Sequence, residues 1–221
     1  MDYMESQEFL INLTSTESVT AVRTESKVKG DKKTFVYAPG AGSNISDPFG
    51  LYLDKYIPSL GYDILRFQFP YMESGKKRPD NASILKETWK AVIGQAGDLS
   101  NLIIGGRSMG GRIASEVVAE GLQIRGLVLF AYPLIPLRGS GIPRDTHFPD
   151  VQVPTLFCSG TRDSFGTPEQ LKLSAAKIGN SQVKLLDGAD HGFAVLKSTG
   201  RDRADVWSDI GSHLRTWLNM R

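Results

Sequence analysis

The chain has 221 residues, of which 40% are hydrophobic and 23% are charged, and its 26 Lys and Arg against 24 Asp and Glu leave a formal charge of +2. This length and balance predict one folded domain over residues 1–221 and exclude a disordered chain. The near-neutral charge argues against a broad basic face for nucleic acid. The one cysteine, Cys158, excludes an internal disulfide framework and a multi-cysteine zinc site.

The sequence also carries signals about the cellular compartment. No apolar run approaches the roughly 20 residues of a membrane-spanning helix. The start, MDYMESQEFL, has acids where a secretory signal peptide has a basic region followed by an apolar one. We therefore expect a cytoplasmic protein with no membrane segment, while the sequence does not indicate an oligomeric state.

Strand-like and helix-like stretches alternate along the chain. In chain order they predict strands at residues 8–13, 18–24 and 34–38, a helix at 47–59, a strand at 62–67, a helix at 81–95, a strand at 101–105, a helix at 109–120, strands at 126–131 and 155–159, a helix at 167–178, a strand at 182–186 and a helix at 203–218. Most of the strands are nearly continuous apolar runs, which is typical of strands that helices bury on both faces. The pattern predicts an α/β fold with a mostly parallel sheet flanked by helices.

One segment does not fit this alternation. Residues 133–152 hold four prolines and show no period. An irregular stretch of about 20 residues is unusual in a compact domain and is often functional. We expect it to form one wall of a cleft.

The sharpest local signal is a G-x-S-x-G pattern centred on Ser108. The pattern is weak alone, but here it directly follows an apolar strand and directly precedes a helix, which is the placement that a nucleophile elbow requires. Gly106 and Gly110 are expected to tolerate no side chain, because neighbouring chain passes close to a sharp, strained turn. The alternative is a glycine-rich turn without chemistry.

A serine nucleophile needs a base, and the chain has only three histidines. His213 lies within the last predicted helix and His147 lies in the proline-rich segment. His191 follows the last predicted strand, and ligands bind at the carboxyl ends of parallel strands. His191 is therefore the predicted base for Ser108.

The base needs an orienting carboxylate. Asp163 follows the strand at 155–159 and lies between Ser108 and His191 in sequence. The resulting order of Ser, Asp and His is the one that α/β-hydrolases use. Asp187 and Asp190 are rivals for this role, but capping or solvating the loop around His191 is the simpler interpretation.

A developing oxyanion needs two hydrogen-bond donors. The backbone N–H of Met109, directly after Ser108, is one candidate. The other is expected in the loop at residues 39–43, where small residues let the backbone approach a substrate. Ala41 is the candidate there and Gly42 is the fallback, with a plain Pro-Gly turn as the alternative.

At this point the chain resembles the α/β-hydrolase superfamily over nearly its whole length, through the motifs PGAGS, GRSMGG, SGTRD and DHGF in that order. It is similar to the small lidless members in the dienelactone-hydrolase-like group. It looks still closer to the hydrolase-like family that includes testis-expressed eukaryotic proteins and a subunit of the NSL acetyltransferase complex. The resemblance implies a sheet of about eight strands, no lid domain, and hydrolysis of small or short-chain carboxylic esters without a metal or organic cofactor.

Two departures from these relatives matter. Many relatives have His where this chain has Pro39, so the oxyanion loop is expected to be held differently. Dienelactone hydrolases have a cysteine at the elbow, whereas this chain has Ser108, which speaks against dienelactone as the substrate. Cys158 is not a substitute for that cysteine, because it lies within a predicted strand and is expected to be a buried core thiol.

Several residues are candidates for binding a small-molecule ester. Tyr132 and Phe148 are predicted to line an apolar pocket beside the proline-rich segment, and Tyr71 to form the opposite wall. Gly42 is a further candidate contact. Arg107 adjoins the nucleophile and is expected to meet either a substrate carboxylate or a structural acid.

The basic cluster at residues 76–78 offers two interpretations: attraction of an acidic substrate, or a solvated loop. Two other functions also stay open. One is a non-catalytic interaction scaffold that keeps the fold, and the other is a thioesterase or peptidase with the same three residues, because one site chemistry serves many acyl substrates.

Overall fold

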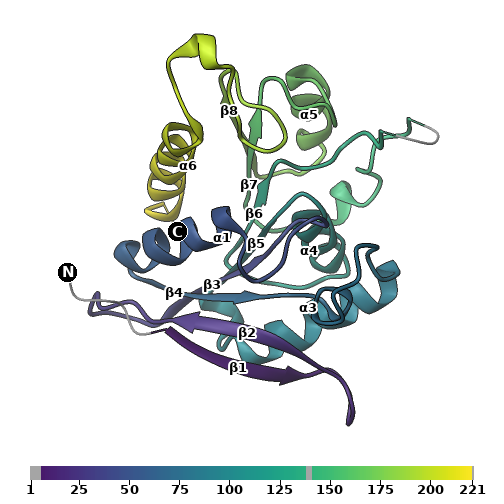
Figure 1. Ribbon diagram of the computed structural model, residues 1–221, viewed down its shortest axis with the longest axis vertical. Coiled ribbons are helices and arrows are strands. Elements are labelled where there is room, and N and C mark those ends of the chain that lie inside the picture. Colours follow the sequence, from purple (N-terminus) through teal and green to yellow (C-terminus); the bar gives the residue numbers. More distant parts are fainter. Residues whose placement is uncertain (1–5, 138–140, 221) are drawn as a thin grey trace.

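A computed structural model describes residues 6–137 and 141–220 (Figure 1). Its centre is an eight-stranded sheet with the order β1-β2-β4-β3-β5-β6-β7-β8. The strands are β1 (Ser6–Asn12), β2 (Ser18–Thr24), β3 (Lys33–Ala38), β4 (Tyr62–Phe67), β5 (Leu102–Arg107), β6 (Gly126–Phe130), β7 (Thr155–Gly160) and β8 (Ser181–Leu186).

The sheet is mixed, with one antiparallel edge. The β1–β2 and β2–β4 pairs are antiparallel. The other five pairs are parallel: β4–β3, β3–β5, β5–β6, β6–β7 and β7–β8. The parallel strands therefore end at one edge of the sheet, where the loops that follow them meet.

Helices cover both faces of the sheet. They are α1 (Pro48–Tyr56), α2 (Pro70–Glu73), α3 (Ala82–Gln95), α4 (Met109–Ala119), α5 (Pro168–Ala175) and α6 (Arg203–Leu218). α1 and α6 lie on one face, and α3, α4 and α5 lie on the other (Figure 1). Each face has its own core of fully buried side chains, as expected when strands are apolar on both sides.

The fold class predicted from the sequence is confirmed: an eight-stranded, mostly parallel sheet flanked by helices on both faces. Most boundaries agree within two residues. The predicted helix at 47–59 is interrupted, because α1 ends at Tyr56 and a 3₁₀ turn follows at Ile57–Leu60. Pro58 in this turn has no N–H to continue an α-helix. The short α2 carries no periodicity and was not predicted.

The proline-rich segment after β6 does not build a lid domain. Its described residues contain one short 3₁₀ turn, Phe148–Asp150, while residues 138–140 lie outside the described part. Within the described ranges, no helix has both the length and the apolarity that crossing a bilayer would require.

The start of α4 packs against strand backbone so closely that two glycines have no room for a side chain. A Cβ on Gly106 would lie 2.5 Å from the backbone of Gly110, and a Cβ on Gly110 would lie 2.5 Å from the Ala38 carbonyl oxygen. Both contacts are with backbone, which cannot swing aside as a flexible side chain would. The expectation that Gly106 and Gly110 tolerate no side chain is confirmed.

We predict that Gly106→Ala lowers the free energy of unfolding by about 1–3 kcal/mol or more, because the added methyl group forces α4 away from the sheet. Gly94→Ala is the matched control, since nothing lies within 4 Å of a Cβ at this position inside α3. The control should be neutral or stabilise the helix by up to about 1 kcal/mol. Equal denaturation midpoints for wild type and Gly106→Ala would show that the close approach is not a constraint.

Candidate active site

Ser108 stands at the turn between β5 and α4. Its backbone has φ 51° and ψ −117°, a conformation that a residue with a side chain rarely adopts. Its N–H donates to the Phe130 carbonyl at 2.8 Å, which ties the turn to the end of β6. The hydroxyl is thereby presented at the carboxyl edge of the sheet, at the N-terminus of α4.

His191 comes from the loop after β8, and its ring meets Ser108. The His191 Nε2 and Ser108 Oγ atoms are 2.9 Å apart. The loop is held by Asp190, whose Oδ1 accepts from the N–H groups of Gly192 and Ala194 at 2.8 Å each. Asp190 therefore caps this loop, as the simpler interpretation predicted, and the rival Asp187 is exposed to solvent.

Asp163 follows β7 and lies on the other side of the His191 ring. His191 Nδ1 is 2.8 Å from Oδ2 and 3.0 Å from Oδ1 of Asp163. The Asp163 side chain is only 2% exposed, and its Oδ1 also accepts from the Phe165 N–H at 2.8 Å. An ionised carboxylate can accept hydrogen bonds but cannot donate them. The proton of His191 is therefore on Nδ1, and Nε2 accepts a hydrogen bond from the Ser108 hydroxyl.

The structure thus brings together Ser108, Asp163 and His191, three residues from three different loops, as the sequence order predicted. Sequence analysis missed a fourth neighbour, Phe165. Its ring centroid lies 4.2 Å from that of His191. The ring packs against the imidazole and, with the Asp163 carboxylate, restricts its orientation. Only the proximity of Phe165 to Asp163 in sequence could have indicated it.

Two backbone N–H groups near Ser108 are free to bind an oxyanion. Among the described residues, neither the Ala41 N–H nor the Met109 N–H has a hydrogen-bond partner. Met109 is the first residue of α4, so its N–H belongs to the positive end of the helix dipole. Ala41 lies in the loop after β3, where a Cβ on Gly40 would come within 3.5 Å of the Ser108 Cβ.

The loop after β3 is braced from two sides. The Tyr71 hydroxyl donates to the Ala41 carbonyl at 2.9 Å, and the Ser43 hydroxyl donates to Asp47 at 3.2 Å. Asp47 is 2% exposed and caps α1 by accepting from the Gly50 N–H. These bonds hold the loop that begins at Pro39.

Tyr71 is predicted to contact substrate, and the structure gives it a further role. It lines a small cavity beside this loop, but it is only 1% exposed and its hydroxyl donates to the Ala41 carbonyl. Burial raises the pKa of Tyr71 well above its usual value, so the hydroxyl stays protonated and donates. Tyr71 therefore positions the loop, and no local sequence signal could link two residues 30 positions apart.

Arg107 meets a structural acid, the second of the two expected alternatives. Its guanidinium lies 3.3 Å from Oδ1 of Asp47 and sits 5.8 Å from the centroid of the Phe193 ring. The Tyr37 hydroxyl donates to the other oxygen of Asp47 at 2.6 Å. Asp47 thus links Arg107, beside Ser108, to the N-terminus of α1.

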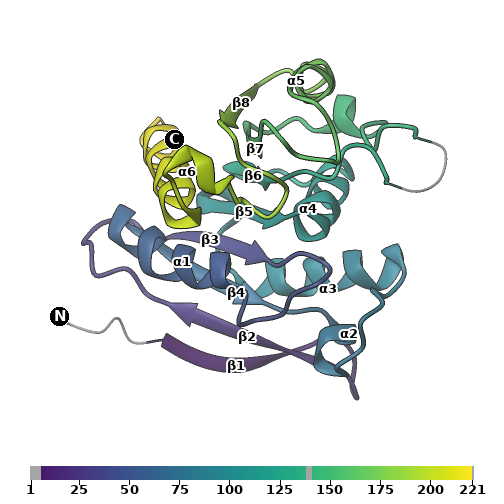
Figure 2. The same ribbon diagram turned by 45° about the horizontal axis from the view of Figure 1, so that its top comes forward.

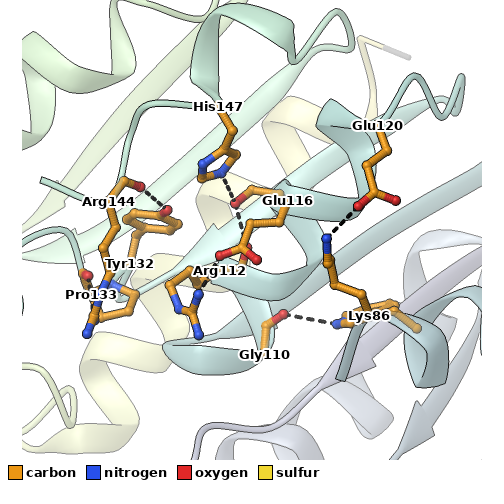
Figure 3. Close-up of polar contacts among 11 residues, drawn as sticks. Lys86, Gly110, Arg112, Glu116, Glu120, Tyr132, Pro133, Arg144 and His147 are labelled. Carbon is orange, nitrogen blue, oxygen red and sulfur yellow. Dashed lines mark hydrogen bonds and ion pairs between the residues drawn. The ribbon is translucent and has the colours of Figure 1, made fainter. Parts of the chain in front are cut away.

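Tyr132 and Phe148 do not reach the site, contrary to expectation. They are 2% and 0% exposed and pack against each other and against Phe157 in the core. The Tyr132 hydroxyl donates to the Arg144 carbonyl at 2.5 Å (Figure 3). Both side chains anchor the proline-rich segment to the sheet, because their large apolar surfaces gain more from burial than from lining an open cleft. Gly42, the remaining candidate contact, lies at the surface beside Ala41.

A second Ser–His pair joins α4 to the proline-rich segment, away from the first pair. His147 Nε2 is 2.8 Å from Ser115 Oγ, and Figure 3 shows His147 pointing toward this part of α4 beside Glu116. Ser115 is fully buried, and no carboxylate is hydrogen-bonded to His147 within the described ranges. Burial lowers the pKa of His147, which favours a neutral ring. The pair lacks both an exposed hydroxyl and an orienting acid.

The other candidates for chemistry are internal. Cys158 is fully buried, and burial raises the pKa of its thiol to about 12, so the expected core role is confirmed. His213 is half-buried on α6. In the described part of the chain, no group of three or more His, Cys, Asp or Glu side chains is arranged to hold a metal ion.

Known proteins with this architecture include several hydrolases. An alpha-beta serine hydrolase homologue from Coxiella burnetii is 22% identical, covers 94% of this chain and 97% of its own, and superposes with a TM-score of 0.73. A dienelactone hydrolase from Anabaena variabilis is 15% identical over 98% of both chains, with a TM-score of 0.72. A serine hydrolase without a lid, XC6422 from Xanthomonas campestris, is 17% identical over 96% of this chain and 95% of its own, with a TM-score of 0.71.

At these identities the structural matches show the fold alone, and the family follows from the sequence itself. Residues 31–219 match the family model described as an alpha/beta hydrolase domain, which takes in every strand from β3 to β8 and the loops that carry Ser108, Asp163 and His191. The chain therefore belongs to the alpha/beta hydrolase family.

Proposed function

We propose that this protein is a serine hydrolase that cleaves small carboxylic esters through an acyl-enzyme on Ser108, with residues 1–221 acting as one catalytic domain. The observation that carries the proposal is the continuous hydrogen-bonded chain from Asp163 through His191 to the Ser108 hydroxyl. The two unpaired N–H groups of Ala41 and Met109 support it, because they lie beside the nucleophile where negative charge would develop.

The reaction begins when His191 Nε2 takes the proton of the Ser108 hydroxyl as Oγ attacks the ester carbonyl carbon. Asp163 keeps the proton on Nδ1 and stabilises the imidazolium that forms. The Ala41 and Met109 N–H groups bind the oxyanion of the tetrahedral intermediate. The intermediate collapses as His191 returns its proton to the leaving alkoxide, and the alcohol departs.

Water completes the cycle. His191 removes a proton from a water molecule, which attacks the acyl carbon and forms a second tetrahedral intermediate in the same oxyanion hole. Collapse breaks the bond to Ser108 Oγ, which takes back the proton from His191, and a carboxylic acid leaves. These steps use only side chains and backbone of the protein.

The strained backbone of Ser108 favours an enzyme over a non-catalytic scaffold. A φ of 51° at a residue with a side chain costs free energy. Such strain is typical of functional sites, and here the strained turn would lift a nucleophile out of the sheet. The short segment after β6 favours small and accessible esters, because it leaves no lid domain to enclose a long acyl chain. The name of the Anabaena variabilis relative denotes a lactone hydrolase, which agrees with ester chemistry.

We predict that Ser108→Ala lowers kcat/KM toward p-nitrophenyl acetate by at least about 10³-fold, because no other hydroxyl can form the acyl-enzyme. Ser115→Ala is the matched control, since Ser115 also pairs with a histidine at 2.8 Å on the same helix but is buried away from the site. It should keep most of the activity. Comparable losses in both variants, or none in Ser108→Ala, would contradict the assignment of the nucleophile.

We also predict that the kcat/KM of the wild type falls as the acyl chain of the p-nitrophenyl ester lengthens from acetyl to octanoyl.

We predict that Asp163→Asn lowers kcat by about 10³–10⁴-fold with little change in KM, because the amide no longer holds the proton on Nδ1 of His191. Asp190→Asn is the control, because Asp190 is next to His191 in sequence and accepts from the N–H groups of Gly192 and Ala194, but is not hydrogen-bonded to the imidazole. Steady-state kinetics with a short-chain ester measure both. An active Asp163→Asn together with an inactive Asp190→Asn would reverse the roles of these carboxylates.

We predict that Tyr71→Phe lowers kcat up to about tenfold while KM changes little, because it removes the hydrogen bond that holds the Ala41 peptide in place. The phenyl ring keeps the packing, so the melting temperature should drop only slightly. A rise in KM with unchanged kcat would mean instead that Tyr71 contributes to substrate binding.

A further inference from the structure

A small cavity opens beside the loop after β3. Its volume is about 370 Å³. It is lined by residues of that loop and of the segment that begins with α2, the short helix that Figure 2 shows beside the turn between β1 and β2. The residues that line it are Ala41, Gly42, Ser43, Asn44, Tyr71, Met72, Gly75, Lys76 and Lys77.

The cavity adjoins the proposed oxyanion hole. Ala41 and Gly42 line it, and the neighbouring Gly40 is close enough to the nucleophile that its Cβ would lie 3.5 Å from that of Ser108. Tyr71 lines the same cavity and holds the Ala41 carbonyl. A group bound here would therefore reach the reacting carbonyl across only a few atoms.

The position of the cavity favours binding of the acyl part of an ester over binding of its alcohol part. His191 comes from the loop after β8, so the leaving oxygen that it protonates must face the β6–β8 side of Ser108. The cavity lies on the opposite side, next to the ends of β3 and β4. With the carbonyl oxygen between Ala41 and Met109, the acyl chain is directed toward the cavity.

The charge of the cavity wall is positive. Lys76 and Lys77 are exposed, and neither forms an ion pair within the described ranges, while the lining includes no Asp or Glu. The two nearest acids in sequence are occupied elsewhere: Glu73 accepts from the Thr20 N–H, and Asp80 accepts from the Tyr71 N–H at 2.9 Å. The ammonium groups are therefore available for a bound anion.

The backbone at Gly75 and Lys76 is held by hydrogen bonds, although the lysine side chains are free. The Lys76 N–H donates to the Tyr71 carbonyl at 2.9 Å, and the Gly75 N–H donates to the Met72 carbonyl at 3.0 Å. The turn is thus fixed to the same tyrosine that positions Ala41. The backbone at Lys76 is therefore fixed relative to the loop that carries Ala41, while the exposed ammonium groups stay free to reach a bound anion.

We propose that this cavity binds a carboxylate at the far end of the acyl chain, so that the preferred substrates are monoesters of short dicarboxylic acids. The proposal rests on the proposed esterase function and adds the substrate class to it. Two lysines at the mouth of a small cavity attract a carboxylate as point charges, with solvent screening that limits the gain. The apolar methylenes of the chain would lie against Met72 and Ala41.

The test compares monoethyl glutarate with ethyl pentanoate, and monoethyl adipate with ethyl hexanoate, by titration of the acid released. Each pair differs only in a carboxylate in place of a methyl group. Wild type should favour at least one charged ester by about three- to tenfold in kcat/KM, a preference that declines as salt is added. Lys76→Ala/Lys77→Ala should abolish this preference by lowering kcat/KM for the charged esters.

Lys27→Ala/Lys29→Ala is the matched control, because it removes the same charge from two exposed lysines in the loop before β3. It should keep the preference. Neutral esters cleaved by wild type with no preference for a charged partner, or equal losses in both double variants, would overturn the carboxylate site while leaving the esterase function standing. Failure of every ester would overturn the esterase function instead.

The site can also be tested without turnover. Calorimetric titration of Ser108→Ala with monoethyl adipate should show binding that is weakened when Lys76→Ala/Lys77→Ala is added. Binding of equal strength in the two backgrounds would overturn the carboxylate site even if ester hydrolysis failed.

Discussion

The close approach of the α4 N-terminus to the strand backbone is the constraint on which the rest of the structure depends. Gly106 and Gly110 leave no space for a Cβ, so the chain must turn sharply between them. Ser108 takes up that turn with a positive φ, and this conformation presents its hydroxyl at the carboxyl edge of the sheet. The same turn puts the first N–H of α4, that of Met109, beside the hydroxyl. The proposed nucleophile and one of the proposed oxyanion donors therefore depend on the same packing requirement.

The other parts of the site are held by buried polar contacts between loops. Asp163 accepts from Phe165 and His191, which keeps the imidazole oriented before any substrate arrives. On the opposite side, Tyr71 holds the Ala41 carbonyl and Asp47 joins the oxyanion loop to α1. Groups that are already in position do not have to be ordered during the reaction, which is the main way in which such a site stabilises a transition state. This bracing also explains how the loop keeps its shape with proline at position 39.

Much of the fold and the three central residues of the site could be predicted from the sequence, because their signals are local. The strand, glycine-rich turn and helix around Ser108 are contiguous, and Asp163 and His191 each follow a recognisable strand. Tyr71 and Phe148 were assigned to substrate binding because they are aromatic residues in loops, whereas both are buried. Their partners, Ala41 for Tyr71 and Tyr132 for Phe148, come from other segments of the chain, so periodicity and spacing contain no information about these contacts. Asp47 is a further example, because its contact with Arg107 joins residues 60 positions apart in the chain.

The central claim is that Ser108 is a nucleophile activated by His191 and Asp163. The most direct measurement is covalent labelling with a fluorophosphonate, followed by intact-mass determination and peptide mapping. The account predicts one label per chain, on Ser108, and loss of labelling in His191→Ala while Ser115→Ala is labelled like wild type. A folded protein that takes up no label, or a label that maps to another serine, would contradict it.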